Sequence, residues 1–64
     1  MNDMAVVFMI TLRHGIWRVT KDGVFYGDYR SRGNAAEGAE SAASALRRAG
    51  RIVKLVIVQP RKED

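Results

Sequence analysis

The chain has 64 residues, of which 47% are hydrophobic and 28% charged, and its 11 basic and 7 acidic residues give a net charge of +4. Below roughly 70–80 residues a hydrophobic core rarely contributes more than about 3–5 kcal/mol, so small folds usually add disulfides, metal ions or self-association. The lack of cysteine excludes disulfides, and a lone histidine, His14, argues against a metal site or a cofactor.

The longest apolar run, residues 5–10, is far shorter than the roughly 20 residues that a membrane span requires. It follows Asp3 rather than a basic leader, so we expect a cytoplasmic protein that does not contact a membrane. We expect one ordered domain over residues 5–59, with flexible termini at residues 1–4 and 60–64.

The first expected strand covers residues 5–13, where side chains alternate between a more apolar and a less apolar side. The dipeptide His14-Gly15 favours a two-residue hairpin into a second strand, Ile16–Thr20. In that register Trp17 and Val19 lie on the side of Leu12. The more apolar side of the first strand consists of Val6, Phe8, Ile10 and Leu12, and the other of Val7, Met9, Thr11 and Arg13.

A third strand is expected at Val24–Tyr29, after a break at residues 21–23. We favour a three-residue loop with Gly23 in the left-handed region, because it collects aromatic side chains on the side that must be buried. A two-residue loop, Asp22-Gly23, would invert every side chain of the strand. The favoured register places Phe25 and Tyr29 with Trp17, and Val24, Tyr26 and Asp28 on the opposite side.

A helix is expected at residues 37–50, with Asn34 as its N-cap and Gly50 as the residue that ends it. Apart from Leu46, its apolar face consists of small residues: Ala35, Gly38, Ala39, Ala42, Ala45 and Ala49. Glycine at position 38 costs roughly 1 kcal/mol against alanine, and we interpret it as room for Trp17 or Phe25.

A fourth strand is expected at residues 52–59, and Pro60 ends it. Its two alternating sets are Val53, Leu55 and Ile57 on one side and Ile52, Lys54, Val56 and Val58 on the other. The fold class is therefore α+β: a three-stranded antiparallel meander, one amphipathic helix packed on one face of the sheet, and a final strand (β-β-β-α-β). The helical crossover makes strand four parallel to strand one, in the expected order 3-2-1-4. Exchange of strand four between two protomers is the alternative.

The first and last expected strands are apolar on both of their faces, whereas one alanine-lined helix covers a single face of the sheet. We therefore expect a homodimer that forms through the sheet face opposite the helix, because an open apolar face of this size usually marks an interaction site. The expected residues of that face are Val7, Met9, Ile16, Val24, Val56 and Val58.

A nucleic-acid-binding module is the alternative function, because basic residues beside an aromatic on a sheet can follow phosphates and stack bases. The candidate contacts are Arg13, Arg18, Tyr26, Arg30, Arg32 and Lys54. No enzymatic activity is expected: His14 lies in a turn without an acid to orient it, and the glycines do not form a phosphate loop.

The spacing Gly15-x-Trp17-x-Val19, the glycine turn at Gly23, and Ser31 before an alanine-rich helix resemble a family of small bacterial domains of unknown function. The chain is also similar to the YegP-type repeat, in which a three-stranded meander precedes such a helix. This resemblance covers about residues 10–58. It implies the fold and supplies no catalytic or binding residue, and the long apolar final strand departs from it.

Overall fold

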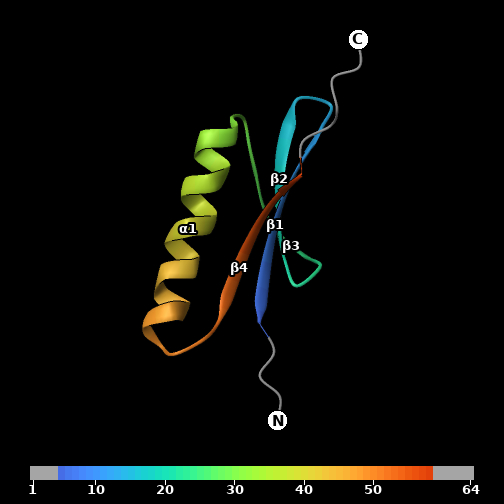
Figure 1. Cartoon of the computed structure of the whole chain (residues 1–64). Helices are drawn as coiled ribbons and strands as arrows, with labels where there is room; N and C mark the ends of the chain where they lie inside the picture. Colours follow the sequence, from blue (N-terminus) through green and yellow to red (C-terminus); the bar gives the residue numbers. More distant parts are fainter. Residues whose placement is uncertain (1–4, 59–64) are drawn as a thin grey trace.

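The computed structural model describes residues 5–58, so the predictions for residues 1–4 and 59–64, including the end of strand four at Gln59, lie outside the described range. The elements are β1 (Val6–Arg13), β2 (Ile16–Lys21), β3 (Val24–Tyr29), α1 (Arg32–Arg48) and β4 (Val53–Val58) (Figure 1). They form one four-stranded sheet in the order β3-β2-β1-β4. The α+β class and the β-β-β-α-β order are confirmed.

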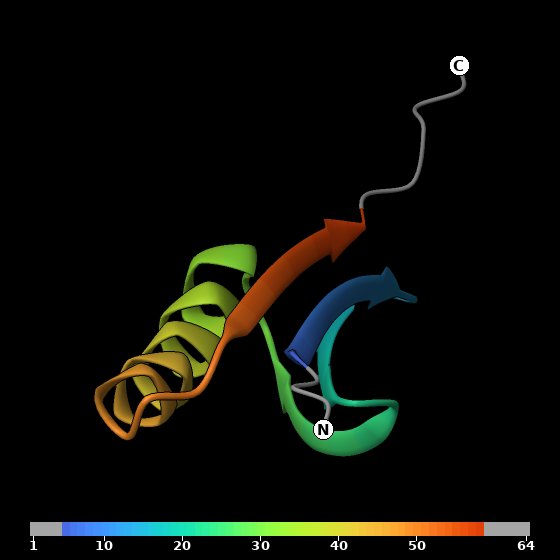
Figure 2. The ribbon, with the colours of Figure 1, turned by 60° about the horizontal axis from the view of Figure 1, so that its bottom comes forward.

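The sheet joins an antiparallel meander of β1, β2 and β3 to a parallel strand, β4, that pairs with β1 of the same chain. The strands curve across the view in Figure 2, and α1 packs on one side of them. The predicted strand order and the parallel direction of β4 are both confirmed. We call the side of the sheet that carries α1 the inner face and the opposite side the outer face.

The first hairpin has the predicted register, with Arg13 opposite Ile16 and Leu12 opposite Trp17. Both turn residues have positive φ, 50° at His14 and 78° at Gly15, as a two-residue type I′ turn requires. This turn matches the right-handed twist of its strands. Trp17 and Val19 therefore lie on the inner face with Leu12, as expected.

The second hairpin also has a two-residue turn, Asp22-Gly23, so the predicted three-residue loop is wrong. Lys21 pairs with Val24, and φ is 50° at Asp22 and 83° at Gly23. Contacts to β1 support this turn: the Asp22 amide donates to the Val7 carbonyl oxygen (2.8 Å), and the Val7 amide donates to Oδ1 of Asp22 (2.9 Å). Aspartate tolerates the left-handed region, and here its carboxylate also satisfies a backbone donor of β1.

A β-bulge inside β3 then shifts the pairing of β3 with β2 by one residue. Thr20 pairs with Phe25 and Val19 with Gly27, which leaves Tyr26 as the extra residue. The two-residue turn sends Phe25 to the outer face, contrary to the prediction. The bulge restores the predicted side for the rest of the strand, because Tyr29 pairs with Trp17 on the inner face.

Val24 and Tyr26 were predicted for the outer face, and both predictions are wrong. Val24 pairs with Lys21, and Lys21 lies opposite the buried Phe8. Val24 therefore belongs to the inner face, although it is exposed. The Tyr26 ring meets Phe8 edge-on, with ring centroids 5.5 Å apart and an interplanar angle of 84°. Both corrections follow from the shorter turn and the bulge.

The helix begins earlier than predicted, at Arg32, with Ser31 rather than Asn34 as its N-cap. Ser31 is extended, and its hydroxyl oxygen accepts from the Asn34 amide at 3.0 Å. At the other end Gly50 has φ 87°, as predicted for the residue after the helix. The Gly50 amide donates to the Arg47 carbonyl (2.9 Å) and the Arg51 amide to that of Leu46 (3.0 Å), which is the Schellman arrangement.

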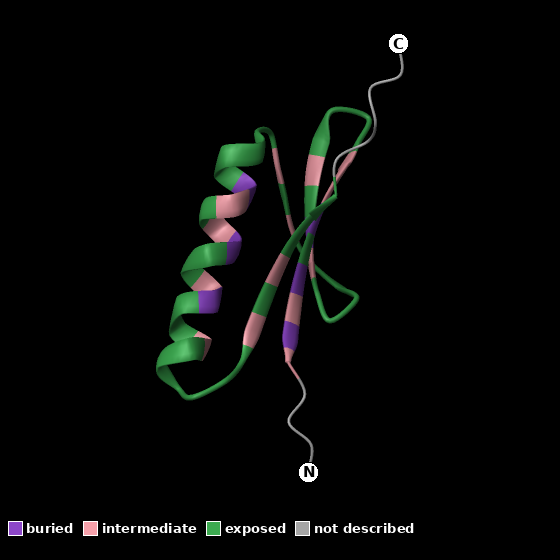
Figure 3. Cartoon of the chain, viewed as in Figure 1, coloured by how far each residue is buried: buried purple, intermediate pink, exposed green. Residues whose placement is uncertain are grey.

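The core lies between the inner face and α1, and it is small. Its largest fully buried side chains are Phe8, Ile10 and Val19, and α1 contributes only alanines, at positions 35, 39 and 43. Figure 3 shows these buried positions as one stripe of the helix that faces the strands. Ala35 and Ala39 were predicted for this face, whereas Ala43 was not, and Ala45 and Ala49 prove to be exposed.

The close approach of helix and sheet is set by Tyr29, not by Trp17 or Phe25 as predicted. A Cβ at Gly38 would lie 2.5 Å from Oη and 2.8 Å from Cζ of Tyr29, and a Cβ at Gly27 would lie 3.2 Å from the same ring. The Tyr29 ring therefore packs against two glycines, one on the helix and one on β3.

This geometry predicts that the effect of Gly38→Ala depends on Tyr29. In the wild-type chain the new methyl group displaces the ring, and we expect the free energy of unfolding to fall despite the gain in helix propensity. In a Tyr29→Ala background the clash is gone, and the same substitution should stabilise by about 1 kcal/mol. Urea titrations of the four chains at one protein concentration measure this coupling. An equal effect of Gly38→Ala in both backgrounds would contradict the packing.

Candidate self-association face

The outer face is formed by alternate residues of all four strands, as the pairing registers define them. β1 and β4 supply its most apolar part, whereas β2 and β3 supply both apolar and polar residues. Its members are Val7, Met9, Thr11, Arg13, Ile16, Arg18, Thr20, Phe25, Asp28, Lys54, Val56 and Val58. In the described part of the chain, α1 lies on the opposite side of the sheet and covers none of these residues.

One row across the middle of this face is largely apolar. The registers align Val56 of β4, Met9 of β1, Thr20 of β2 and Phe25 of β3. The exposed fractions are 39% for Val56, 38% for Met9 and 59% for Phe25. Three exposed apolar side chains, interrupted only by Thr20, therefore lie in one row from one edge of the sheet to the other.

Five of the six predicted residues of the self-association face lie on the outer face: Val7, Met9, Ile16, Val56 and Val58. The sixth, Val24, lies on the inner face for the reason given above. Phe25 belongs to the outer face and was missed. The signal that would have found it is the Asp22-Gly23 pair itself, which is a strong two-residue hairpin sequence.

The next row of the outer face is polar, and its charges are paired. Nε of Arg18 donates to Oδ1 of Asp28 at 3.0 Å and Nη2 to Oδ2 at 3.3 Å. The guanidinium carbon also lies 5.3 Å from the centre of the Phe25 ring, a cation–π distance. The hydrogen bonds to Asp28, and then the charge of its carboxylate, raise the pKa of Arg18 above its ordinary value.

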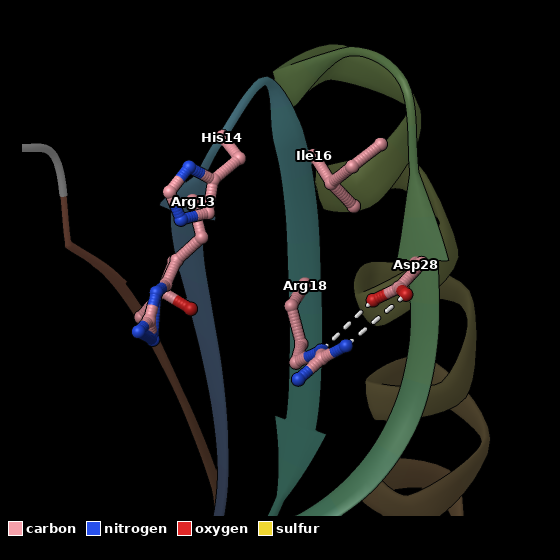
Figure 4. Close-up of a pocket in the computed structure, with 6 residues that line it drawn as sticks. Arg13, His14, Ile16, Arg18 and Asp28 are labelled. Atoms are coloured by element: carbon pink, nitrogen blue, oxygen red, sulfur yellow. Dashed lines mark hydrogen bonds and ion pairs between the residues drawn. The ribbon is translucent and has the colours of Figure 1, made fainter.

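The outer face is hollowed near the first hairpin, where a cavity of about 390 Å³ is lined by Thr11, Arg13, His14, Ile16, Arg18 and Asp28. Figure 4 shows Arg13 and His14 on the β1 side of this cavity, with the Arg18–Asp28 pair across it. Asp28 is bound to Arg18 and lies away from His14, so it does not orient the imidazole as a general base would require.

The predicted nucleic-acid contacts do not form one cluster. Arg13 and Arg18 line the cavity, whereas Lys54 pairs with Val7 at the opposite end of β1. Arg30 follows β3 and Arg32 begins α1, so both lie at the connection between sheet and helix. Tyr26 lies on the inner face, and its predicted place on the outer face is taken by Phe25.

Within residues 5–58, no group of three or more histidine, cysteine or acidic side chains is placed to hold a metal ion. In the same range, no helix is both long and apolar enough to span a membrane. No protein-family model, curated protein or solved structure matches the chain. The resemblance to the YegP-type repeat stays a prediction.

Proposed function

We propose that this chain is a small non-enzymatic domain that associates with a second copy of itself through the outer face of the sheet. The observation that carries the proposal is the exposed row of Val56, Met9 and Phe25, set against a core whose largest fully buried side chains are only Phe8, Ile10 and Val19. Covering the row removes apolar surface from water, which is worth about 25 cal/mol per Å².

A second copy fits this face because the face can pair with itself about a two-fold axis. Two sheets that pack face to face lie about 10 Å apart, and the side chains between them interdigitate. In such a dimer the apolar row forms the centre of the contact. The row that contains the Arg18–Asp28 pair adjoins it as a polar border, which matches the usual anatomy of interfaces.

We predict that the wild-type chain self-associates at tens of micromolar and that Met9→Glu abolishes this association. Met9 lies in the middle of the row, on the strand between β2 and β4, so a carboxylate there would be buried unpaired in the contact. Sedimentation equilibrium measures the mass, and circular dichroism reports whether the chain remains folded.

The matched control is Val24→Glu, which introduces the same charge at an exposed apolar residue of the inner face. This variant should associate as the wild type does. A wild-type chain that is a monomer at these concentrations, or a Val24→Glu variant as dissociated as Met9→Glu, would refute the proposal.

Single-stranded nucleic acid is the second candidate partner. The observation that favours it is the combination of Arg13 and Arg18 in one cavity with an exposed aromatic, Phe25, beside Arg18 on the same face. Phosphates would approach the guanidinium groups, and a base would stack on the Phe25 ring.

For this candidate, the fluorescence anisotropy of a labelled single-stranded oligonucleotide should report binding that weakens with salt, with a log–log slope of about −0.7 per phosphate contact. Arg13→Gln should reduce both the affinity and the slope. Arg48→Gln, which removes the same charge from the end of α1, should reduce them less. The absence of salt-sensitive binding near about 50 mM salt would exclude this partner.

A further inference from the structure

β4 is a terminal strand, and within residues 5–58 no strand pairs with its outer edge. The Val6 amide donates to the carbonyl oxygen of Ile52 at 2.9 Å. The backbone groups of Ile52, and of every second residue after it, therefore point toward β1. Alternate residues of a strand direct their backbone groups to opposite sides, so the amides and carbonyls of Val53, Leu55 and Ile57 point away from β1. They form an open row of donors and acceptors.

The two edges of the sheet differ in how they resist pairing. The β3 edge contains the Tyr26 bulge, Gly27 and an aspartate held by Arg18, and such features block the addition of a strand. The β4 edge, by contrast, pairs with β1 in an unbroken register and carries one charge, Lys54, among five aliphatic residues. Only the β4 edge resembles a strand that accepts a partner.

β4 is also exposed on both faces at its C-terminal half. Val56 and Val58 face outward, whereas Ile57 lies on the inner face and is still 42% exposed. Packing a second copy on the outer face covers Val56 and Val58. It leaves Ile57 in water and the edge amides and carbonyls without protein partners, so both remain available for a second contact.

We propose that β4 pairs antiparallel with β4 of a second copy, which joins two four-stranded sheets into one of eight strands. This contact goes beyond the outer-face contact, because it uses the backbone edge of β4 and not the side chains of the outer face. The added strand has to cover aliphatic side chains on both faces of β4, and a second β4 suits this because it carries such side chains on both faces itself. It must also present open backbone groups along its edge, which the β4 edge does.

The position of Lys54 selects the register. A two-fold axis at Lys54 would place the two lysines directly opposite each other, which is unfavourable. An axis at Val56 pairs Lys54 with Val58 of the second copy and separates the lysines by four residues, about 14 Å along the strands. That exceeds the screening length of about 10 Å at 0.1 M salt.

The same register covers the inner face. Leu55 lies opposite Ile57 of the second copy, and both direct their backbone groups toward the contact, as an antiparallel hydrogen-bonded pair requires. The two-fold axis is perpendicular to the sheet, so the helices of both copies lie on the same side of the joined sheet. Figure 1 shows the end of α1 beside the start of β4, so the reversed second copy brings these segments toward Ile57.

Disulfide trapping tests this register because the chain has no cysteine of its own. At the proposed axis the two Val56 Cα atoms lie about 4.5 Å apart, within the range of about 4.4–6.8 Å that a disulfide spans. We expect the oxidised Val56→Cys chain to form a covalent dimer at least roughly tenfold faster than Val58→Cys, whose two positions lie about 14 Å apart.

The Met9→Glu background separates this contact from the outer-face contact, because Met9 lies on β1, one strand in from the edge, and its backbone groups take no part in the β4 pairing. Trapping through Val56→Cys should persist there. Ile57→Lys should abolish trapping, whereas Ile52→Lys, at an exposed residue before the strand, should not. Equal trapping rates for Val56→Cys and Val58→Cys in the Met9→Glu background, where the outer-face contact is absent, would overturn the β4 pairing.

Discussion

The close contact between an alanine-lined helix and a sheet of large side chains determines the rest of this structure. Ala35, Ala39 and Ala43 let α1 approach the sheet, so the volume of the core comes from strand residues such as Phe8 and Ile10. Small helix residues bury little area of their own, and they cover only the one face they touch. The opposite face, with its exposed side chains Met9, Phe25 and Val56, then remains open, and our proposal of self-association is based on that exposure.

The bulge at Tyr26 connects the core to the outer face. Without it the two-residue turn would send Tyr29 outward, and the space at Gly38 would be empty. With it, Tyr29 packs against the helix and Tyr26 covers Phe8, while Phe25 remains on the outer face beside Arg18. One extra residue therefore strengthens a small core and adds an aromatic to the exposed row.

Alternation along β1 and β4 predicted their faces correctly because those strands are regular, and a period of two leaves little freedom there. The second hairpin was not predictable in the same way. The Asp22-Gly23 pair is a local signal for the two-residue turn, and hydrogen bonds between Asp22 and Val7, which are 15 residues apart, add support that alternation does not reveal. The length of the turn decides which face Val24 and Phe25 occupy, and the bulge decides the face of Tyr26. The errors in the candidate site therefore all lie in β3.

The prediction of the N-cap was wrong for a local reason. Ser31 and Asn34 are both good N-cap residues, and only the backbone conformation distinguishes them.

The central claim is that the folded chain is stabilised by covering its outer face with a second copy. Association that binds the folded state alone makes stability depend on protein concentration. The most direct test is therefore the thermal midpoint of the wild-type chain, measured from the low micromolar to the millimolar range. The account predicts a midpoint that rises steadily with concentration. A midpoint that is the same across that range would show that the single chain is stable with its outer face in water.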